Sequence, residues 1–406
     1  MDIMKIFEET AYVRMGGSAE ELRCAEYLKE QVANLGLEAT IEPFEVQMAT
    51  IEEATLVVDG KEIPCKGYRN AGSHEVEAPL YYLTSNDKYA LSKCKGKIVL
   101  LDGYLGYWMY RDILENGAVG FITYDGNANY ADCDIDQREL RAQVSEGVEK
   151  IPGVNINAKS AIELVKNNAA TAKIVLKQEE FTANSHNVIL EMPGTRPETI
   201  VFTAHYDSTS LSQGAYDNMS GSVGLLGIAE YFTKRPHSYG LRFVWCGSEE
   251  RGLLGAKAYC RDHEEALKDV VLNINLDMIG CIMGKMIACC TTEDKLVNYI
   301  EYLGYELGKS IRAYQDVYSS DSTPFADKGI PAVSFARVCP PNTATIHNSY
   351  DTMAVMKAEH MEDDITVICA FADRMANAVQ LPVARTMPDN MKDKLDIYLC
   401  RKRDKK

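Results

Sequence analysis

The sequence predicts a three-layer α/β fold around a mixed, largely parallel sheet, with a β-rich domain inserted into it. The chain has 406 residues, which is enough for about two domains of ordinary size. After residue 186, continuous apolar runs alternate with segments of helical periodicity, as in α/β domains. Between residues 50 and 179, short apolar runs separated by glycines dominate instead. We therefore predict a discontinuous main domain (1–49 and 180–385), an inserted domain (50–179) and a C-terminal tail (386–406).

The start of the first helix is marked by a capping box. Ser18 and Glu21 form its S-x-x-E pattern. Apolar residues at helical spacing follow as far as Leu35. Gly36 is a natural helix end, because glycine readily adopts the left-handed conformation found there. A strand is expected next, at 39–46.

The inserted segment is expected to consist mainly of short strands, with one helix at 159–166. Glycines such as Gly96, Gly117 and Gly126 punctuate it. It contains no pairing of histidine and carboxylate residues at metal-ligand spacing. We therefore assign it no catalytic role. The strands are expected at 54–58, 80–83, 97–101, 119–124 and 151–156.

The strands expected in the main domain are mostly uninterrupted apolar runs, which is typical of strands covered by helices on both faces. In such sheets, ligands bind beyond the carboxyl ends of the strands. The tail, which ends in the basic run from Arg401 to Lys406, is expected to lie in solvent. The strands are expected at 187–192, 199–204, 241–246, 271–276 and 332–335, and the helices at 220–232, 253–263, 291–307 and 356–378.

The charge of the chain excludes some classes of partner. Lys+Arg 43 against Asp+Glu 59 gives a net charge of −16, which would repel phosphates and anionic lipids, so neither nucleic acid nor a membrane is an expected partner. No apolar run is long enough to span a bilayer. The first residues lack the pattern of a signal peptide, so we expect a cytoplasmic protein. The 12 cysteines include no C-x-x-C pair, which favours reduced, structural thiols.

Histidine and carboxylate residues follow the expected strands of the main domain. Because the carboxyl ends of parallel strands meet at one edge of a sheet, these residues should lie close together. Each one alone would more often be a helix cap, a turn residue or a solvated side chain. Together they form the mixed nitrogen and oxygen ligand set that suits zinc or another divalent metal. They are His205 and Asp207 after 199–204, Asp217 in the next loop, Glu249 and Glu250 after 241–246, Asp277 after 271–276, and His347 in a late loop.

This combination favours a two-metal hydrolase, in which one carboxylate bridges two ions and another acts as a base. Asp207 lies two residues after His205, so in an extended segment both side chains face the same side. Asp207 could then hold the imidazole in one tautomer. The side chains of Glu249 and Glu250 diverge because the residues are adjacent. One can therefore bind metal while the other faces the substrate.

Five motifs resemble those of the co-catalytic zinc exopeptidases of the aminopeptidase Y type, a family that includes the secreted bacterial leucine aminopeptidases. The motifs occur in the family's order, with similar gaps, over residues 186–352. They are His205-x-Asp207, Tyr216-Asp217-Asn218, Ser248-Glu249-Glu250-x-Gly252, Asn275-x-Asp277-Met278 and His347-x-x-x-Asp351-Thr352.

The resemblance implies an aminopeptidase that holds two divalent metal ions, expected to be Zn²⁺, and acts on peptides with a free N-terminus. Glu249 would be the general base on the bridging water and then the acid that protonates the leaving amine. Asp207 would orient one histidine ligand. One ion would be held by His205, Asp217 and Asp277, and the other by Asp217, Glu250 and His347, with Asp217 bridging.

Two positions depart from the family's pattern. Ser322 stands where the family has a histidine in its S-D-H-x-P-F stretch, and Ile346 stands where several bacterial relatives carry a carbonyl-binding tyrosine. The oxyanion stabiliser is therefore left open between a tyrosine such as Tyr350 and a backbone N–H group.

The inserted segment resembles a protease-associated domain, which would cover or restrict the active-site cleft. The resemblance depends on Lys97-Ile98-Val99-Leu100, Gly117-Ala118-Val119-Gly120 and Ile151-Pro152.

Two other functions stay open. The same fold could serve a carboxypeptidase or a one-metal glutaminyl cyclase, and it could also serve a receptor-like binding module without catalysis. A serine hydrolase or a dinucleotide enzyme is disfavoured, because no G-x-S-x-G or G-x-G-x-x-G motif follows a strand. The preferred N-terminal residue, the native metal and the oligomeric state are not predicted.

Overall fold

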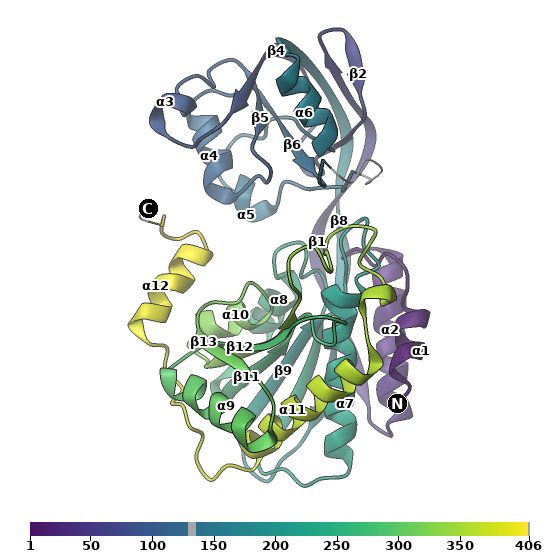
Figure 1. Cartoon of the computed structure of the whole chain (residues 1–406), viewed down its shortest axis with the longest axis vertical. Helices are drawn as coiled ribbons and strands as arrows, with labels where there is room; N and C mark the ends of the chain where they lie inside the picture. The colour runs from purple at the N-terminus through teal and green to yellow at the C-terminus, as the bar shows by residue number, and fades with distance from the viewer. Residues whose placement is uncertain (129–134, 405–406) are drawn as a thin grey trace. The chain divides into compact units, whose positions relative to one another are not determined.

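The computed structural model describes residues 1–128 and 135–404, and the chain divides into two compact units. Unit 1 comprises Met1–Phe44 and Asn184–Lys406, and unit 2 comprises Glu45–Ala183. The boundaries therefore fall a few residues away from the predicted ones at 49/50 and 179/180. Two long strands, β1 (Ala39–Val58) and β8 (Thr171–Met192), cross them without interruption (Figure 1).

Unit 1 contains a mixed, mostly parallel sheet, as the apolar runs predicted. Its strands follow the order β13-β12-β14-β11-β9-β10-β8. The central neighbours β10, β9, β11 and β14 are parallel, whereas β8 is antiparallel to β10 and β12 is antiparallel to β14. The strands are β9 (Thr199–His205), β10 (Gly240–Cys246), β11 (Val270–Leu276), β12 (Lys285–Thr291), β13 (Arg312–Gln315) and β14 (Ala332–Val338).

Helices cover both faces of this sheet. Because side chains alternate along a strand, Phe202 of β9 faces the core of one layer and Val201 faces the core of the other. The first layer contains α1 (Ile3–Glu9), α2 (Ala19–Asn34), α7 (Ser220–Thr233), α9 (Asp294–Leu307) and α11 (Ala358–Ala376). The second contains α8 (Leu254–Asp262) and α10 (Ser322–Asp327).

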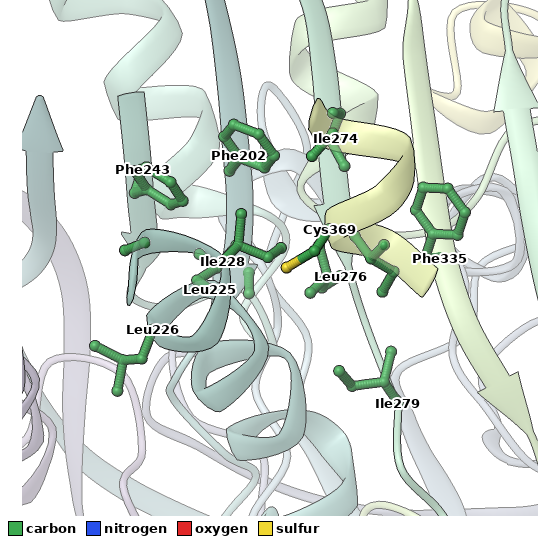
Figure 2. Close-up of a cluster of buried hydrophobic side chains, with 14 of the residues drawn as sticks. Phe202, Leu225, Leu226, Ile228, Phe243, Ile274, Leu276, Ile279, Phe335 and Cys369 are labelled. Atoms are coloured by element: carbon green, nitrogen blue, oxygen red, sulfur yellow. The ribbon is translucent and has the colours of Figure 1, made fainter. Parts of the chain in front are cut away.

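The larger core lies between the sheet and helices α7 and α11. Figure 2 shows Leu225 and Ile228 of α7 and Cys369 of α11 beside Phe202 and Ile274 from two strands. All these side chains are at most 4% exposed. Burial of this apolar surface fixes β9 and β11, whose carboxyl ends carry candidate site residues.

Helix α2 begins and ends as the sequence predicted, but it is the second helix and not the first, because α1 precedes it and was missed. The amide N–H of Glu21 donates to the Ser18 hydroxyl at 3.1 Å. Gly36 has a φ of 79°, the left-handed conformation that favours glycine after a helix.

Strand β12 was missed by the sequence prediction, and it carries the adjacent Cys289 and Cys290, both buried. The helix expected at 291–307 begins only at Asp294, because Thr291 is still part of β12. The shorter helical turns of unit 1 are η1 (Ala215–Met219), η2 (Ala266–Asp269) and η3 (Met353–Val355).

Unit 2 has its own hydrophobic core and its own strand order, β8-β4-β5-β6-β7-β3, with β2 paired to β1. It also contains the helix α4, which the sequence prediction missed. The strands are β2 (Lys61–Ile63), β3 (Cys65–Gly67), β4 (His74–Leu83), β5 (Ile98–Leu101), β6 (Gly120–Asp125) and β7 (Gly153–Asn157). The helices are α3 (Lys88–Leu91), α4 (Tyr107–Glu115), α5 (Ala142–Ser145) and α6 (Ala158–Lys166).

The C-terminal tail was expected to lie in solvent; its basic end, residues 401–404, is exposed, whereas the part before it is helical and packs against α10 and β14. Residues 389–398 form α12 (Asp389–Tyr398). Met391 and Leu395, four residues apart on one helix face, are buried with Ala326 and Ala332. The tail has too few apolar residues to predict a helix from their spacing. Two of them, Met391 and Leu395, are nevertheless enough to pack one face of α12 against its neighbours. Lys405 and Lys406 lie outside the described residues.

Across residues 1–128 and 135–404, no helix has both the length and the apolar character that a membrane span requires.

Replacing Met391 with alanine should lower the free energy of unfolding by about 2–5 kcal/mol, because the side chain is fully buried and a cavity would remain. Lys392→Ala, on the exposed side of the same helix, should change stability little. Urea unfolding of both variants measures the difference. Equal stability of the two variants would mean that α12 does not pack in solution.

Candidate metal centre

Two clusters of histidine and carboxylate side chains lie at the carboxyl edge of the unit 1 sheet, and they share one residue. The first consists of His205, Asp217 and Asp277, and the second of Asp217, Glu250 and His347. In each cluster the candidate ligand atoms all lie within 4.8 Å of one another. The structure thus brings together the five residues that the sequence suggested as metal ligands.

Asp217 faces both clusters because its two oxygens point to different histidines. Its Oδ1 is 3.2 Å from Nε2 of His205, and its Oδ2 is 3.1 Å from Nε2 of His347. Nε2 of His347 is also 3.1 Å from Oε2 of Glu250. Nε2 of His205 is 3.8 Å from Oδ1 of Asp277. A single carboxylate can therefore contribute one oxygen to each of two ions.

The end of β9 places His205 and Asp207 on the same side, as the alternation of an extended chain predicts. Nδ1 of His205 is 3.5 Å from Oδ1 of Asp207. The carboxylate of Asp207 also accepts the backbone N–H groups of Glu249 and Glu250, at 2.9 Å and 3.3 Å. Asp207 therefore connects the His205 strand end to the turn that carries both glutamates.

Glu249 and Glu250 diverge from the turn after β10. Oε2 of Glu249 is 3.9 Å from Nε2 of His205, whereas Glu250 reaches His347 in the other cluster. Ser248, which precedes them, has a φ of 53°, so this turn bends sharply before the glutamates. Glu250 thus belongs to the second cluster, whereas Glu249 belongs to neither and has its carboxylate beside the first.

Two residues near Asp217 hold its backbone. The buried carboxylate of Asp351 accepts the N–H groups of Tyr216 and Asp217, at 2.8 Å and 3.1 Å. The side-chain oxygen of Asn218 accepts the N–H of Met278 at 3.0 Å, next to Asp277. These contacts connect the shared aspartate to the His347 loop and to the end of β11.

The electrostatics of the site favour a cation. Four carboxylates, those of Asp217, Glu249, Glu250 and Asp277, converge on two imidazoles. Oδ1 of Asp277 is buried with no hydrogen-bond donor among the residues that the structure describes. A buried anionic oxygen without a donor is costly unless a cation binds it. The donor set therefore fits divalent metal ions.

Burial and the crowding of carboxylates also shift the pKa values of the residues at this site. Burial raises the pKa of Glu249 well above its usual value, and the nearby charges of Glu250 and Asp277 add to the shift. Burial lowers the pKa of His347, but the carboxylates of Glu250 and Asp217 outweigh this effect and raise it to about 12. Without metal, the site would therefore retain protons, which metal binding must release.

Two further buried aspartates, Asp351 and Asp321, belong to the surroundings of the site, and no role was predicted for either. Burial raises the pKa of Asp351 to about 7. It also raises the pKa of Asp321 to about 7, with repulsion from Asp277 and Asp207 adding to the shift. Asp351 lies in the motif that begins at His347, and Asp321 directly precedes Ser322, but neither position by itself indicates a role.

Ser322 and Ile346, the two residues that depart from the family pattern, contact other parts of unit 1. Ser322 is buried, and its hydroxyl is 2.8 Å from that of Ser334 on β14. Ile346 is partly buried against the larger core. Tyr350 is 49% exposed. The oxyanion stabiliser stays unassigned.

Sequence comparison identifies relatives over most of the chain. Residues 187–372, which include both clusters, match the sequence model of peptidase family M28. Aminopeptidase YwaD of Bacillus subtilis is 30% identical over 339 residues, which cover 79% of this chain and 71% of that protein.

Two solved structures share the fold over nearly the whole chain. BSAP, a zinc aminopeptidase from Bacillus subtilis, superposes with a TM-score of 0.77 at 24% identity, covering 95% of this chain and 96% of that one. An aminopeptidase from Aneurinibacillus sp. strain AM-1 gives a TM-score of 0.74 at 23% identity, with coverages of 92% and 93%.

The shared aspartate leads to a prediction about metal stoichiometry. Protein stripped with a chelator and titrated with Zn²⁺ should bind about two ions per chain. Asp217→Ala should lose both ions, because both clusters need this side chain, whereas His347→Ala should lose only one. Metal analysis after gel filtration gives the stoichiometry.

Asp262→Ala, which removes a surface carboxylate on α8, is the matched control and should bind metal like the wild type. Retention of one ion by Asp217→Ala would show that the two sites do not share this residue.

Proposed function

This chain belongs to peptidase family M28, and from that membership and the two clusters we propose how it works as a metal-dependent aminopeptidase. It hydrolyses the N-terminal peptide bond of its substrates. The observation that carries the mechanism is the position of Asp217, which faces one cluster with each oxygen. Glu249 stands beside the clusters and belongs to neither.

The proposed ligands of one ion are His205, Asp217 and Asp277, and those of the other are Asp217, Glu250 and His347. The nitrogen and oxygen donors suit zinc, and the similar BSAP structure is described as a zinc aminopeptidase. Two such ions, when bound, supply a Lewis acid for the scissile carbonyl and lower the pKa of a water molecule.

Glu249 is the proposed base. Its Oε2 would take a proton from the attacking water and later deliver it to the nitrogen of the leaving amine. Its carboxylate lies 3.9 Å from Nε2 of His205, beside both clusters, where it can exchange a proton with the water and the leaving amine. The carboxylate of Asp207 accepts the backbone N–H of Glu249 and so holds this residue in place; in this proposal it also orients His205.

The expected substrates are peptides with a free N-terminus. A protonated terminal amine is a cation, and the chain carries a net charge of −16, so long-range attraction favours its approach. Near the site, the carboxylates outnumber the imidazoles.

Two of the alternatives lose support from the same geometry. A one-metal cyclase needs only one ligand set, yet both sets are assembled here. A binding module without catalysis has no use for Glu249 beside the clusters. A carboxypeptidase differs in the end of the peptide that it releases, which the substrate assay below decides.

We also propose that unit 2 is a protease-associated domain. The proposal is supported by the three short stretches that resemble such a domain. Unit 2 also has a hydrophobic core of its own, as an inserted domain needs. Neither cluster includes a residue from the described part of unit 2, and we propose no chemical role for this unit.

Glu249→Gln should lower kcat by about 10²–10⁴-fold, because the variant lacks a base, while both metal ions stay bound. Glu250→Gln, the matched change one residue later, should instead weaken metal binding. Steady-state kinetics combined with metal analysis separates the two effects. Wild-type kcat in a fully loaded Glu249→Gln variant would remove this residue as the base.

Hydrolysis should require both a metal ion and a free substrate amine. A panel of aminoacyl amides should be cleaved, their N-acetylated counterparts should not, and chelation should abolish cleavage until Zn²⁺ or Co²⁺ is added back. Mass spectrometry of a defined peptide identifies the released residue. Release from the C-terminus would indicate a carboxypeptidase, and loss of ammonia from an N-terminal glutamine would indicate a cyclase.

A further inference from the structure

Arg14 is a buried charge held mainly by backbone carbonyl groups. It lies between α1 and α2, far in sequence from both clusters, and its exposed fraction is 0%. A buried guanidinium normally pairs with a carboxylate. Among the residues that the structure describes, no carboxylate forms an ion pair with Arg14; its side chain instead donates five hydrogen bonds to backbone carbonyls.

Three of these carbonyls belong to the loop that joins His205 to Asp217. Nε of Arg14 donates to Tyr206 O at 2.8 Å, directly after His205. Nη1 donates to Gln213 O at 2.6 Å, and Nη2 donates to Gly214 O at 3.1 Å, shortly before Asp217. One planar side chain therefore holds both ends of the loop between two proposed ligands.

The backbone of Arg14 strengthens this attachment. Its N–H donates to the Ser208 hydroxyl at 3.0 Å, and the N–H of Ser208 donates back to Arg14 O at 3.1 Å. Gly214 has a φ of 55°, and a Cβ there would lie 2.6 Å from Asp217 O and 3.0 Å from Nη2 of Arg14. The loop thus closes too tightly on the backbone of Asp217 to accept a side chain at position 214.

The remaining hydrogen bonds attach Arg14 to its own segment. Nη1 also donates to Thr10 O and Tyr12 O, at 2.7 Å and 2.9 Å. The loop is therefore connected to the end of α1, which packs in the larger core. On the other side of Asp217, Asp351 holds the backbone N–H groups, so the shared aspartate is fixed from both directions.

We propose that Arg14 is a positioning residue of the two-metal centre, which sets the separation of His205 and Asp217 by holding the loop Tyr206–Gly214 at both ends. The proposal rests on the function proposed above. It assigns to the segment before α2, outside the stretch 187–372 that matches the family, a part in metal affinity. Lysine could not replace Arg14, because its three donors on one atom cannot form a planar fork.

Arg14→Lys tests this role by metal affinity. The dissociation constant for Zn²⁺, measured by competition with a chromogenic chelator, should rise by about 10–100-fold, the effect usual for groups that orient ligands. Arg374→Lys, which changes a partly exposed arginine of α11 that pairs with Glu306, should bind Zn²⁺ like the wild type. Thermal unfolding of metal-free protein is measured in parallel.

The outcomes separate the two proposals. If the wild type binds no metal, the proposed function fails. If the wild type binds two ions and folded Arg14→Lys binds them equally well with only a lower Tm, Arg14 is purely structural and the inference is overturned. If Arg14→Lys does not fold, Ser208→Ala replaces it. This variant removes one hydrogen bond to the Arg14 backbone and should weaken Zn²⁺ binding roughly twofold to tenfold; unchanged binding would equally overturn the inference.

Discussion

The carboxylate of Asp217 faces His205 with one oxygen and His347 with the other, and much of the nearby structure keeps it in that orientation. Asp351 accepts its backbone N–H, and the side chain of Asn218, the next residue, accepts the N–H of Met278 just after the end of β11. Because the two clusters have only this side chain in common, a shift of Asp217 would disturb both. The geometry of the whole centre therefore depends on how firmly this one loop is held.

The negative charge gathered around Asp217 must be neutralised by bound protons or by metal ions. Four carboxylates within a few ångströms repel one another, and burial adds a desolvation penalty to each. Folding brings them together nevertheless, because the apolar residues of β9, β10 and β11 are buried between two layers of helices. The cores on the two sheet faces thus offset the electrostatic strain at the sheet edge.

The fold and the cluster residues were predictable because both follow local rules. Apolar runs reveal buried strands, and a polar residue directly after such a run, as with Asp277, is placed at the sheet edge by that position alone. Arg14 and Asp351 follow no such rule. Their partners are backbone atoms of segments 192 and 134 residues away in the chain. Because every residue has the same backbone groups, the sequence does not indicate which of them a distant side chain will bind. Helix α12 was not predicted for a related reason, because its packing depends on a surface that α10 and β14 form only in the folded protein.

The long strands β1 and β8 cross the boundary of the two units as hydrogen-bonded neighbours. Just beyond the crossing, the side chain of Gln47 donates to the Thr182 hydroxyl at 3.1 Å. The chain therefore leaves unit 1 and returns to it at nearly the same point. An evolving gene could gain or lose the intervening 139 residues, Glu45–Ala183, at such a point without changing the path of the rest of the chain. The two chain ends that such a deletion leaves lie on neighbouring strands, so joining them costs little chain entropy.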